Sequence, residues 1–329
     1  MCGIVGYVGA RPARDLLLAG LAKLEYRGYD SAGISILNGD TVDCVRAVGN
    51  LQALRDAVAA RPVAAGEPAG EAPPAVALAE PSTGIGHTRW ATHGRVSERN
   101  AHPHADESER IHIVVNGIVE NYMALKRELV AAGTTFTSET DAEVIAHLIA
   151  RHYDGDLAAA VRAAYGQLEG HFAFVAMSAD EPGVLVGARR ECPLVVGRGE
   201  DEQFVASAVP AFLEHTRRVQ FIEDGELVVL RPGDVEFMTA DGTPVERAVV
   251  EIDWDADTAE KGGYETFMLK EIHEQADAVA ETIADRTARG DGVDLGDLGA
   301  VDDALLREVR RIVVVACGTS YHAGLIGRY

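Results

Sequence analysis

The feature that most restricts the fold of this chain lies at its start, where Cys2 is followed at once by an apolar strand. The apolar residues of this strand are Ile4, Val5, Tyr7 and Val8. Gly3, Gly6 and Gly9 interrupt them, and glycines inside a strand mark a bend or a place where another backbone comes close. We therefore expect a closely packed first strand with Cys2 at its beginning and the rest of the chain organised around it.

Cys2 carries two reactive groups once the initiator methionine is removed, which is usual before a small residue. The thiol has an ordinary pKa near ~8.5, and the new α-amine, with a pKa near ~7.7–8.0, is partly neutral in the cell. The amine can take the proton of its own thiol, directly or through one water, which activates the sulfur as a nucleophile. Taken alone, Cys2 is also open to interpretation as a small buried hydrophobe or a lipidation site.

Composition sets the broad class of the chain. Its 329 residues predict two domains or one large one, and 47% apolar residues with a mean hydropathy near zero describe a soluble globular protein. A formal net charge of −22 argues against nucleic acid and anionic membranes as partners, because both require basic patches. The longest apolar runs are too short to span a membrane, and we expect no leader before Cys2.

The cysteines and histidines do not predict a metal centre. The four cysteines, none in a CxxC pair, are Cys2, Cys44, Cys192 and Cys317. They indicate neither a zinc site nor a disulfide framework, so we expect a reducing, cytoplasmic compartment. His87, His93 and His102 have no carboxylate or cysteine at ligand spacing, and we interpret them as structural. We expect no metal and no organic cofactor.

Hydrophobic periodicity predicts alternating helices and strands. Helices are expected from Pro12, over 51–60, over 121–132, after Ser138 and from near Asp156. Short strands are expected over 34–37, 42–45, 111–115, 171–177, 184–188, 194–197, 204–206, 226–231 and 235–238, with a hairpin turn over 38–40 and another turn at 241–242. Helices bracketed by strands in this way predict stacked sheets covered by helices, an α+β sandwich.

The pattern also divides the chain. Residues 61–83 are rich in Ala, Gly, Pro and Glu, so they predict a mobile surface insertion within a domain that covers 1–252. A polar linker over 253–264 follows, and residues 265–329 begin a second domain. There we expect an amphipathic helix with Ile272, Val279 and Ile283 on one face, then a second helix to Arg311 and an apolar strand over 312–316.

Arg89 and the Asn116-Gly117 pair are candidates for binding an amide near the thiol. Arg89 ends a predicted strand, where a guanidinium can bind a carboxylate with two hydrogen bonds, although a surface salt bridge is the commoner role of a lone arginine. The Asn116 side-chain amide and the Gly117 N–H group follow an apolar strand and could donate to an oxyanion. An Asn-Gly pair also signals a plain turn, and both interpretations stay open.

Two further motifs each have a structural explanation. Ser138-x-x-Asp141 matches a helix capping box, and that explanation is favoured over binding of an ammonium group, although one carboxylate can serve both roles. The run Cys317-Gly318-Thr319-Ser320 lies at a predicted strand-to-helix junction, where N–H groups and hydroxyls favour a phosphate. Glycine and hydroxyl residues are also ordinary helix-capping residues.

In combination, these motifs resemble the glutamine–fructose-6-phosphate aminotransferase (isomerizing) family, also called glucosamine-6-phosphate synthases. The matching segments occur in the family's order over nearly the whole chain: Cys2 to Gly6, Tyr26 to Gly33, His87 to Gly94, Asn116-Gly117, Ser138 to Asp141 and Cys317 to Ser320. The resemblance implies an N-terminal-nucleophile fold, an αββα sandwich of the class II glutamine amidotransferases. A truncated α/β sugar-isomerase (SIS) domain would follow it.

The resemblance also implies roles for individual residues. Cys2 would be the nucleophile, with Asn116 and Gly117 forming the oxyanion hole. Arg89 would bind the carboxylate of L-glutamine and Asp141 its ammonium group. The ammonia released would convert fructose 6-phosphate to glucosamine 6-phosphate in the full-length protein, a homodimer through its isomerase domain.

Other residues of the same motifs would assist. Thr92 and His93 would help to bind glutamine, and Trp90 would belong to a covering loop that helps to gate ammonia. Arg27 would support the surroundings of the thiol. In the second domain, the pair Thr319-Ser320 would contact the sugar phosphate.

The chain departs from the family pattern in an insertion, at two single positions and in its length. The insertion before Gly84 is extra, Val115 stands where the family usually has His, and Ala276 stands where it usually has Pro. The chain also stops just after the first predicted strand of the isomerase domain, and a lone parallel strand cannot satisfy its backbone. We therefore expect a fragment that keeps at most the glutaminase half of the activity.

Two alternatives stay open. One is a different class II amidotransferase, serving nucleotide or asparagine synthesis. The other is a non-catalytic sugar-phosphate sensor, which would require a retained Met1 or an inert Cys2.

Overall fold

The computed structural model describes residues 2–60, 82–253, 264, 267–287, 303–316 and 318–328. The chain divides into two compact units, Met1–Gly262 and Gly263–Tyr329. Much of the predicted insertion, residues 61–81, lies outside the described residues, as does most of the predicted linker. Thr83, predicted to end the insertion, instead begins a strand and is buried.

The first unit contains two antiparallel sheets. The order of the eight-stranded sheet is β15 (Val250–Glu251), β11 (Arg218–Phe221), β9 (Val195–Arg198), β10 (Gln203–Ala206), β1 (Gly3–Val8), β4 (Thr83–Arg89), β2 (Ser31–Asn38) and β3 (Thr41–Val48). The order of the seven-stranded sheet is β14 (Pro244–Val245), β13 (Asp234–Thr239), β12 (Glu226–Arg231), β8 (Leu185–Arg190), β7 (Gly170–Ser178), β6 (Ile111–Val119) and β5 (His104–Ala105). The first strand therefore lies inside its sheet, between β10 and β4.

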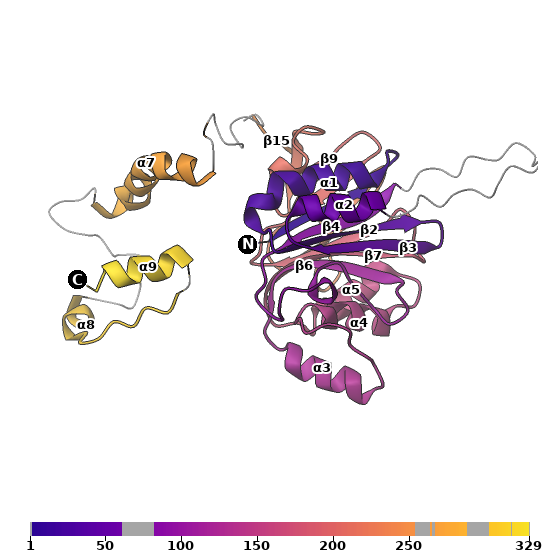
Figure 1. The fold of residues 1–329 in the computed structure, drawn as a ribbon, viewed down its shortest axis with the longest axis horizontal. Helices are drawn as coiled ribbons and strands as arrows, with labels where there is room; N and C mark the ends of the chain where they lie inside the picture. The colour runs from indigo at the N-terminus through magenta and orange to yellow at the C-terminus, as the bar shows by residue number, and fades with distance from the viewer. Residues whose placement is uncertain are drawn as a thin grey trace, which may run out of the picture. The chain divides into compact units, whose positions relative to one another are not determined.

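Helices cover the outer face of each sheet (Figure 1). Over the eight-stranded sheet lie α1 (Ala13–Leu24) and α2 (Leu51–Ala60), and against the seven-stranded sheet lie α3 (Tyr122–Ala131), α4 (Glu143–His152) and α5 (Leu157–Tyr165). Short 3-10 turns are η1 (Glu25–Arg27), η2 (Glu98–Asn100) and η3 (Val209–Ala211). The second unit contains α7 (Phe267–Thr287), α8 (Asp303–Glu308) and α9 (Gly318–Ile326). The predicted α+β sandwich of the first unit is confirmed.

The alternation of side chains along β1 explains the layered core. Val5 and Tyr7 point to the helix side and pack in the cluster that contains Leu17 and Leu21 of α1. Ile4 and Val8 point the other way, into the cluster between the two sheets. Burying each such side chain stabilises the fold by about 1.5–3 kcal/mol, so a strand that is apolar on both faces belongs in the middle of the sandwich.

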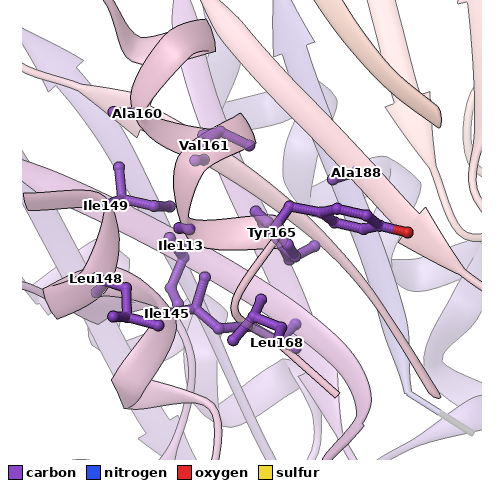
Figure 2. Packing of buried hydrophobic residues seen from close by; sticks show 14 of the residues in the cluster. Ile113, Ile145, Leu148, Ile149, Ala160, Val161, Tyr165, Leu168 and Ala188 are labelled. Atoms are coloured by element: carbon purple, nitrogen blue, oxygen red, sulfur yellow. The ribbon is translucent and has the colours of Figure 1, made fainter. Parts of the chain in front are cut away.

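A third apolar layer lies under the seven-stranded sheet (Figure 2). Ile145 and Ile149 of α4 meet Val161 of α5, and Ile113 of β6 lies among them. The hydroxyl of Tyr165 at the end of α5 donates to the Arg189 carbonyl, so the one polar atom of this ring is satisfied at the edge of the layer. This layer holds the helix side of β6, the strand that carries Asn116.

Two structural predictions are wrong. The predicted capping box at Ser138 does not start a helix. Helix α4 begins at Glu143, after Ala142, and its N-terminus has no side-chain cap. The hydroxyl and N–H groups of Ser138 instead donate to Glu143 Oε2, at 2.6 and 2.7 Å. The apolar run 312–316 forms no strand, because a strand needs a paired neighbour and no described residue pairs with this run. Val315 within it is 92% exposed.

Candidate active site

The start of β1 and the end of β4 meet beside the thiol of Cys2. Gly3 of β1 pairs with Thr88 of β4, so the residues after β4 lie beside Cys2. The Trp90 N–H group donates to Cys2 Sγ at 3.1 Å. A Cβ at Gly3 would lie 2.6 Å from Thr88 Oγ1, so this close approach requires glycine.

Asn116 and Gly117 bring the second sheet to the same place. Asn116 Nδ2 donates to the Cys2 carbonyl at 3.0 Å. Both residues lie within β6, so the plain-turn interpretation of the Asn-Gly pair is wrong. Gly117 has φ +93°, and a Cβ there would lie 2.0 Å from the His171 carbonyl oxygen, so only glycine fits.

Arg89, the last residue of β4, is a buried cation. Its side chain is not a surface salt bridge, since the residue is 2% exposed and Nη2 donates to the His93 carbonyl at 2.6 Å. Nη1 is buried without a hydrogen-bond partner among the described residues. Burial lowers the pKa of Arg89, opposed by the negative charges of Asp30 and Asp141, and a guanidinium still remains protonated. An unused donor on a buried cation is a site for an anionic group.

Asp141 is a buried carboxylate, 5% exposed, that faces the same region. Its Oδ2 accepts the Val119 N–H at 2.8 Å, and its Oδ1 lies 3.5 Å from His93 Nδ1. Burial raises the pKa of Asp141, while the Val119 N–H, His93 and Arg89 act to lower it. The carboxylate is held at the end of β6 and not in the first turn of a helix.

The loop after β4 is anchored by Asp30, a residue that the sequence reasoning did not single out. Its Oδ2 accepts the Ala91 N–H. Trp90 is 49% exposed and meets the ring of Tyr29 edge-on at 5.4 Å, and Thr92 is exposed. The sequence did contain a signal for Asp30, because this residue belongs to the segment 26–33 that carries part of the family resemblance.

The thiol of Cys2 is not pre-ionised. Burial raises its pKa, and the negative charge of Asp30 acts in the same direction. The Trp90 N–H and Arg89 oppose this rise without cancelling it. A base that takes the thiol proton would activate this sulfur. His87, whose pKa burial lowers to about 3, donates from its ring to Asn116 and does not contact the sulfur.

Arg27 acts on the site through a neighbouring residue. Arg27 Nη1 donates to the Ser207 carbonyl at 3.1 Å, and Ser207 Oγ accepts the Ile4 N–H at 3.0 Å. Arg27 therefore supports the start of β1 through a neighbour. Thr319 and Ser320 lie in the first turn of α9 in the second unit, and the phosphate site predicted there stays a prediction.

The chain is similar to known amidotransferases by sequence. The family described as glutamine amidotransferase domain matches residues 87–214. The glutamine–fructose-6-phosphate aminotransferase [isomerizing] of Streptomyces coelicolor is 47% identical over 331 residues, which cover 100% of this chain and 51% of the relative. The enzyme of the same name from Caldanaerobacter subterraneus is 43% identical over 329 residues, with the same coverage.

Solved structures share the fold at lower identity. The glutamine phosphoribosylpyrophosphate amidotransferase from B. subtilis, complexed with ADP and GMP, has a TM-score of 0.58 and 24% identity, covering 73% of this chain and 49% of that chain. A structure of the allosteric regulatory enzyme of purine biosynthesis has a TM-score of 0.59 and 25% identity, with the same coverage. The likeness confirms the predicted sandwich of class II amidotransferases.

The chain spans about half the length of the curated relatives that it matches. No described helix is both long enough and apolar enough to cross a membrane.

Proposed function

Because the chain belongs to the family of glutamine–fructose-6-phosphate aminotransferases, we propose that its first unit hydrolyses L-glutamine through the thiol of Cys2. The observation that carries the proposal is the meeting of two sheets at this residue. The Trp90 N–H of one strand end contacts the sulfur, and the Asn116 amide of the other sheet contacts the Cys2 carbonyl. A nucleophile beside preset oxyanion donors suits acyl transfer.

The reaction proceeds in two halves. After removal of Met1, the α-amine of Cys2 takes the thiol proton, and the sulfur attacks the side-chain amide carbon of glutamine. Asn116 Nδ2 and the Gly117 N–H stabilise the oxyanion of the tetrahedral intermediate. The C–N bond then breaks, the leaving nitrogen takes the proton from the α-amine, and ammonia departs. Water finally hydrolyses the γ-glutamyl thioester and returns the proton to sulfur.

The groups around the thiol distinguish glutamine from other amides. Arg89, with its unused Nη1, binds the α-carboxylate, and the buried Asp141 carboxylate binds the α-ammonium group. Thr92 and His93 assist at the same end of the substrate. Trp90, exposed on its loop, covers the bound amino acid and helps to gate the released ammonia.

In the whole protein, the ammonia serves to convert fructose 6-phosphate to glucosamine 6-phosphate. The proposed division is a glutaminase domain over 1–252, a linker over 253–264 and the start of a sugar-isomerase domain over 265–329, where the pair Thr319-Ser320 contacts the phosphate. The relatives' name supports this assignment. We place the protein in the cytoplasm as a homodimer through its isomerase domain, with neither nucleic acid nor membrane as a partner.

The two alternative functions are less well supported. Amidotransferases of purine synthesis share the fold at 24–25% identity, whereas the relatives named for fructose 6-phosphate reach 41–47% over the full chain. Stimulation of glutaminase activity by fructose 6-phosphate in the full-length protein separates these two enzymes. A non-catalytic sensor would hydrolyse no glutamine.

Glutamate release from glutamine by this chain tests the proposal. Cys2→Ala removes the sulfur that attacks the amide and should abolish measurable turnover. Cys44→Ser is the matched control, since Cys44 lies in β3, outside the proposed site, and its replacement should leave turnover unchanged. Turnover that survives Cys2→Ala would contradict the proposal.

A further inference from the structure

We propose that His87 is a positioning residue, which holds the side-chain amide of Asn116 with its NH₂ group toward Cys2. The inference rests on the proposed function, because it concerns the orientation of an oxyanion donor. His87 lies in β4, where it pairs with Ile4 of β1, and its side chain is fully buried. It thus reaches from the sheet that carries Cys2 to the sheet that carries Asn116.

The two contacts of the His87 ring fix its tautomer. Nε2 lies 2.9 Å from the Val115 carbonyl oxygen and 3.1 Å from Asn116 Oδ1. A carbonyl oxygen only accepts hydrogen bonds, so Nε2 must carry the hydrogen. A neutral imidazole has a single N–H group, which leaves Nδ1 unprotonated. Burial keeps the ring neutral by lowering its pKa to about 3.

The tautomer in turn fixes the amide. A donor at His87 Nε2 requires Oδ1 of Asn116 on that side, and Nδ2 then points to the Cys2 carbonyl at 3.0 Å. A flipped amide would place its NH₂ group against the Nε2 hydrogen and its oxygen against the Cys2 carbonyl. Both hydrogen bonds would be lost at once, so the ring selects one of the two amide orientations.

The surroundings of His87 hold the ring without offering a competing partner. His102 lies against it with ring centroids 4.2 Å apart, and His104 follows at 4.4 Å from His102. His87 Nδ1 is buried and has no hydrogen-bond partner among the described residues. The packing thus restrains the ring, and no described donor favours the other tautomer. The histidines interpreted as structural from the sequence therefore include one that orients the site.

Steady-state kinetics with glutamine test the proposal. His87→Phe keeps the ring shape but removes the donor, and we expect kcat to fall by about 10- to 100-fold, because misplaced catalytic groups act on the transition state. KM should change little, because oxyanion donors act mainly after binding. His87→Gln carries an NH₂ group of similar reach and should restore most of kcat. Unchanged kcat in a folded His87→Phe variant would overturn the proposal.

A double-mutant cycle separates positioning from general structural support. Asn116→Ala removes the donor itself, so adding His87→Phe to that background should cost little further activity. Losses that multiply would overturn the proposal. His112→Phe is the matched control: His112 is buried in β6 and bonded to Ser35, but it does not touch Asn116, so its replacement should spare kcat.

A measurement on the wild-type chain tests the proposal even if the variants fail to fold. Nitrogen-15 NMR of the histidine rings at pH 7 should show Nε2 of His87 protonated and Nδ1 unprotonated. The reverse tautomer would overturn the proposal. If the wild-type chain releases no glutamate, the proposed function fails, whereas wild-type turnover with a fully active His87→Phe variant refutes only the role of His87.

Discussion

At the scale of single residues, burial decides which of the charged groups can bind a substrate. Arg89 and Asp141 have almost no exposed surface, and Nη1 of Arg89 has no hydrogen-bond partner among the described residues. Burial lowers the pKa of Arg89 and raises that of Asp141, and the charge of each residue acts against the shift of the other. A zwitterionic amino acid can pair with both groups, which is the basis of the proposed specificity.

Arg89→Lys should raise the KM for glutamine by about 10- to 100-fold. A lysine keeps the charge but cannot form a two-pronged hydrogen bond with a carboxylate, and such charge-assisted bonds contribute about 1.5–3 kcal/mol. Initial-rate kinetics provide the measurement. Arg95→Lys is the control, because Arg95 is an exposed residue of the same loop and pairs only loosely with Glu139, at 3.8 Å. Equal KM values for both variants would refute the binding role of Arg89.

Sequence could predict the residue types of the site but not their orientations. Cys2, Arg89 and Asn116 stand out because a thiol, a guanidinium and an amide occur at the ends of strands predicted from the sequence. The burial of Arg89 and the tautomer of His87 depend on contacts with distant segments, and no local pattern reports them. Ser138 is the clearest failure, since its spacing fits a capping box while its hydroxyl turns to Glu143.

At the scale of elements, the segment between α3 and α4 is held by a buried carboxylate. Glu143 accepts hydrogen bonds from Thr137 and Ser138, and Ser138 Oγ lies 2.9 Å from Thr140 Oγ1, which contacts His104 at 3.0 Å. Burial alone would raise the pKa of Glu143, but His147 and these donors hold it well below its usual range. This network places Asp141 beside β6.

Glu143→Gln should lower the free energy of unfolding at pH 7 by about 2–4 kcal/mol, because charged acceptors give the stronger hydrogen bonds. The pKa of the folded state is depressed, so this stabilisation is present above the unfolded pKa near ~4.3 and is lost as the pH falls below it. Urea unfolding at pH 7 and pH 3.5 should therefore show a smaller difference between variant and wild type at the lower pH.

Glu128→Gln is the matched surface control. Glu128 pairs with Arg151 at 2.6 Å but both are exposed, so its replacement should change stability by less than about 1 kcal/mol. A Glu143→Gln variant as stable as this control at pH 7 would contradict the anchoring role.

Long elements were predictable and short edge strands were not. α2 and β12 have the predicted boundaries, because ten residues of helical period and six of apolar strand are strong local signals. β5, β14 and β15 have two residues each and were missed. They are strands only because a neighbouring strand pairs with them, so their own residues carry no periodic pattern.

At the scale of the whole molecule, the apolar clusters found among the described residues belong to the first unit. All three apolar clusters consist of residues between Ile4 and Ile252. In the second unit residues 312–315 of the apolar run are exposed. The sequence could predict this run as apolar but could not show whether a partner strand accompanies it, because pairing is a property of the whole sheet.

A chain of residues 1–253 should therefore keep the stability and the glutaminase kcat of the 329-residue chain. No buried residue of the three clusters is removed, so the thermal midpoint of the first unit should move by less than about 3 °C. Calorimetry and the glutamate-release assay provide the measurements. Loss of cooperative unfolding after this truncation would show that residues 254–329 complete the first unit.

The most direct test of the central claim is intact-mass and peptide mass spectrometry after treatment with the glutamine-mimicking electrophile 6-diazo-5-oxo-norleucine. We predict that the protein lacks Met1, takes up one equivalent of the reagent and carries it on Cys2, with excess glutamine protecting it. A retained Met1 in active protein, or a label on another residue, would contradict the assignment of Cys2 as the N-terminal nucleophile.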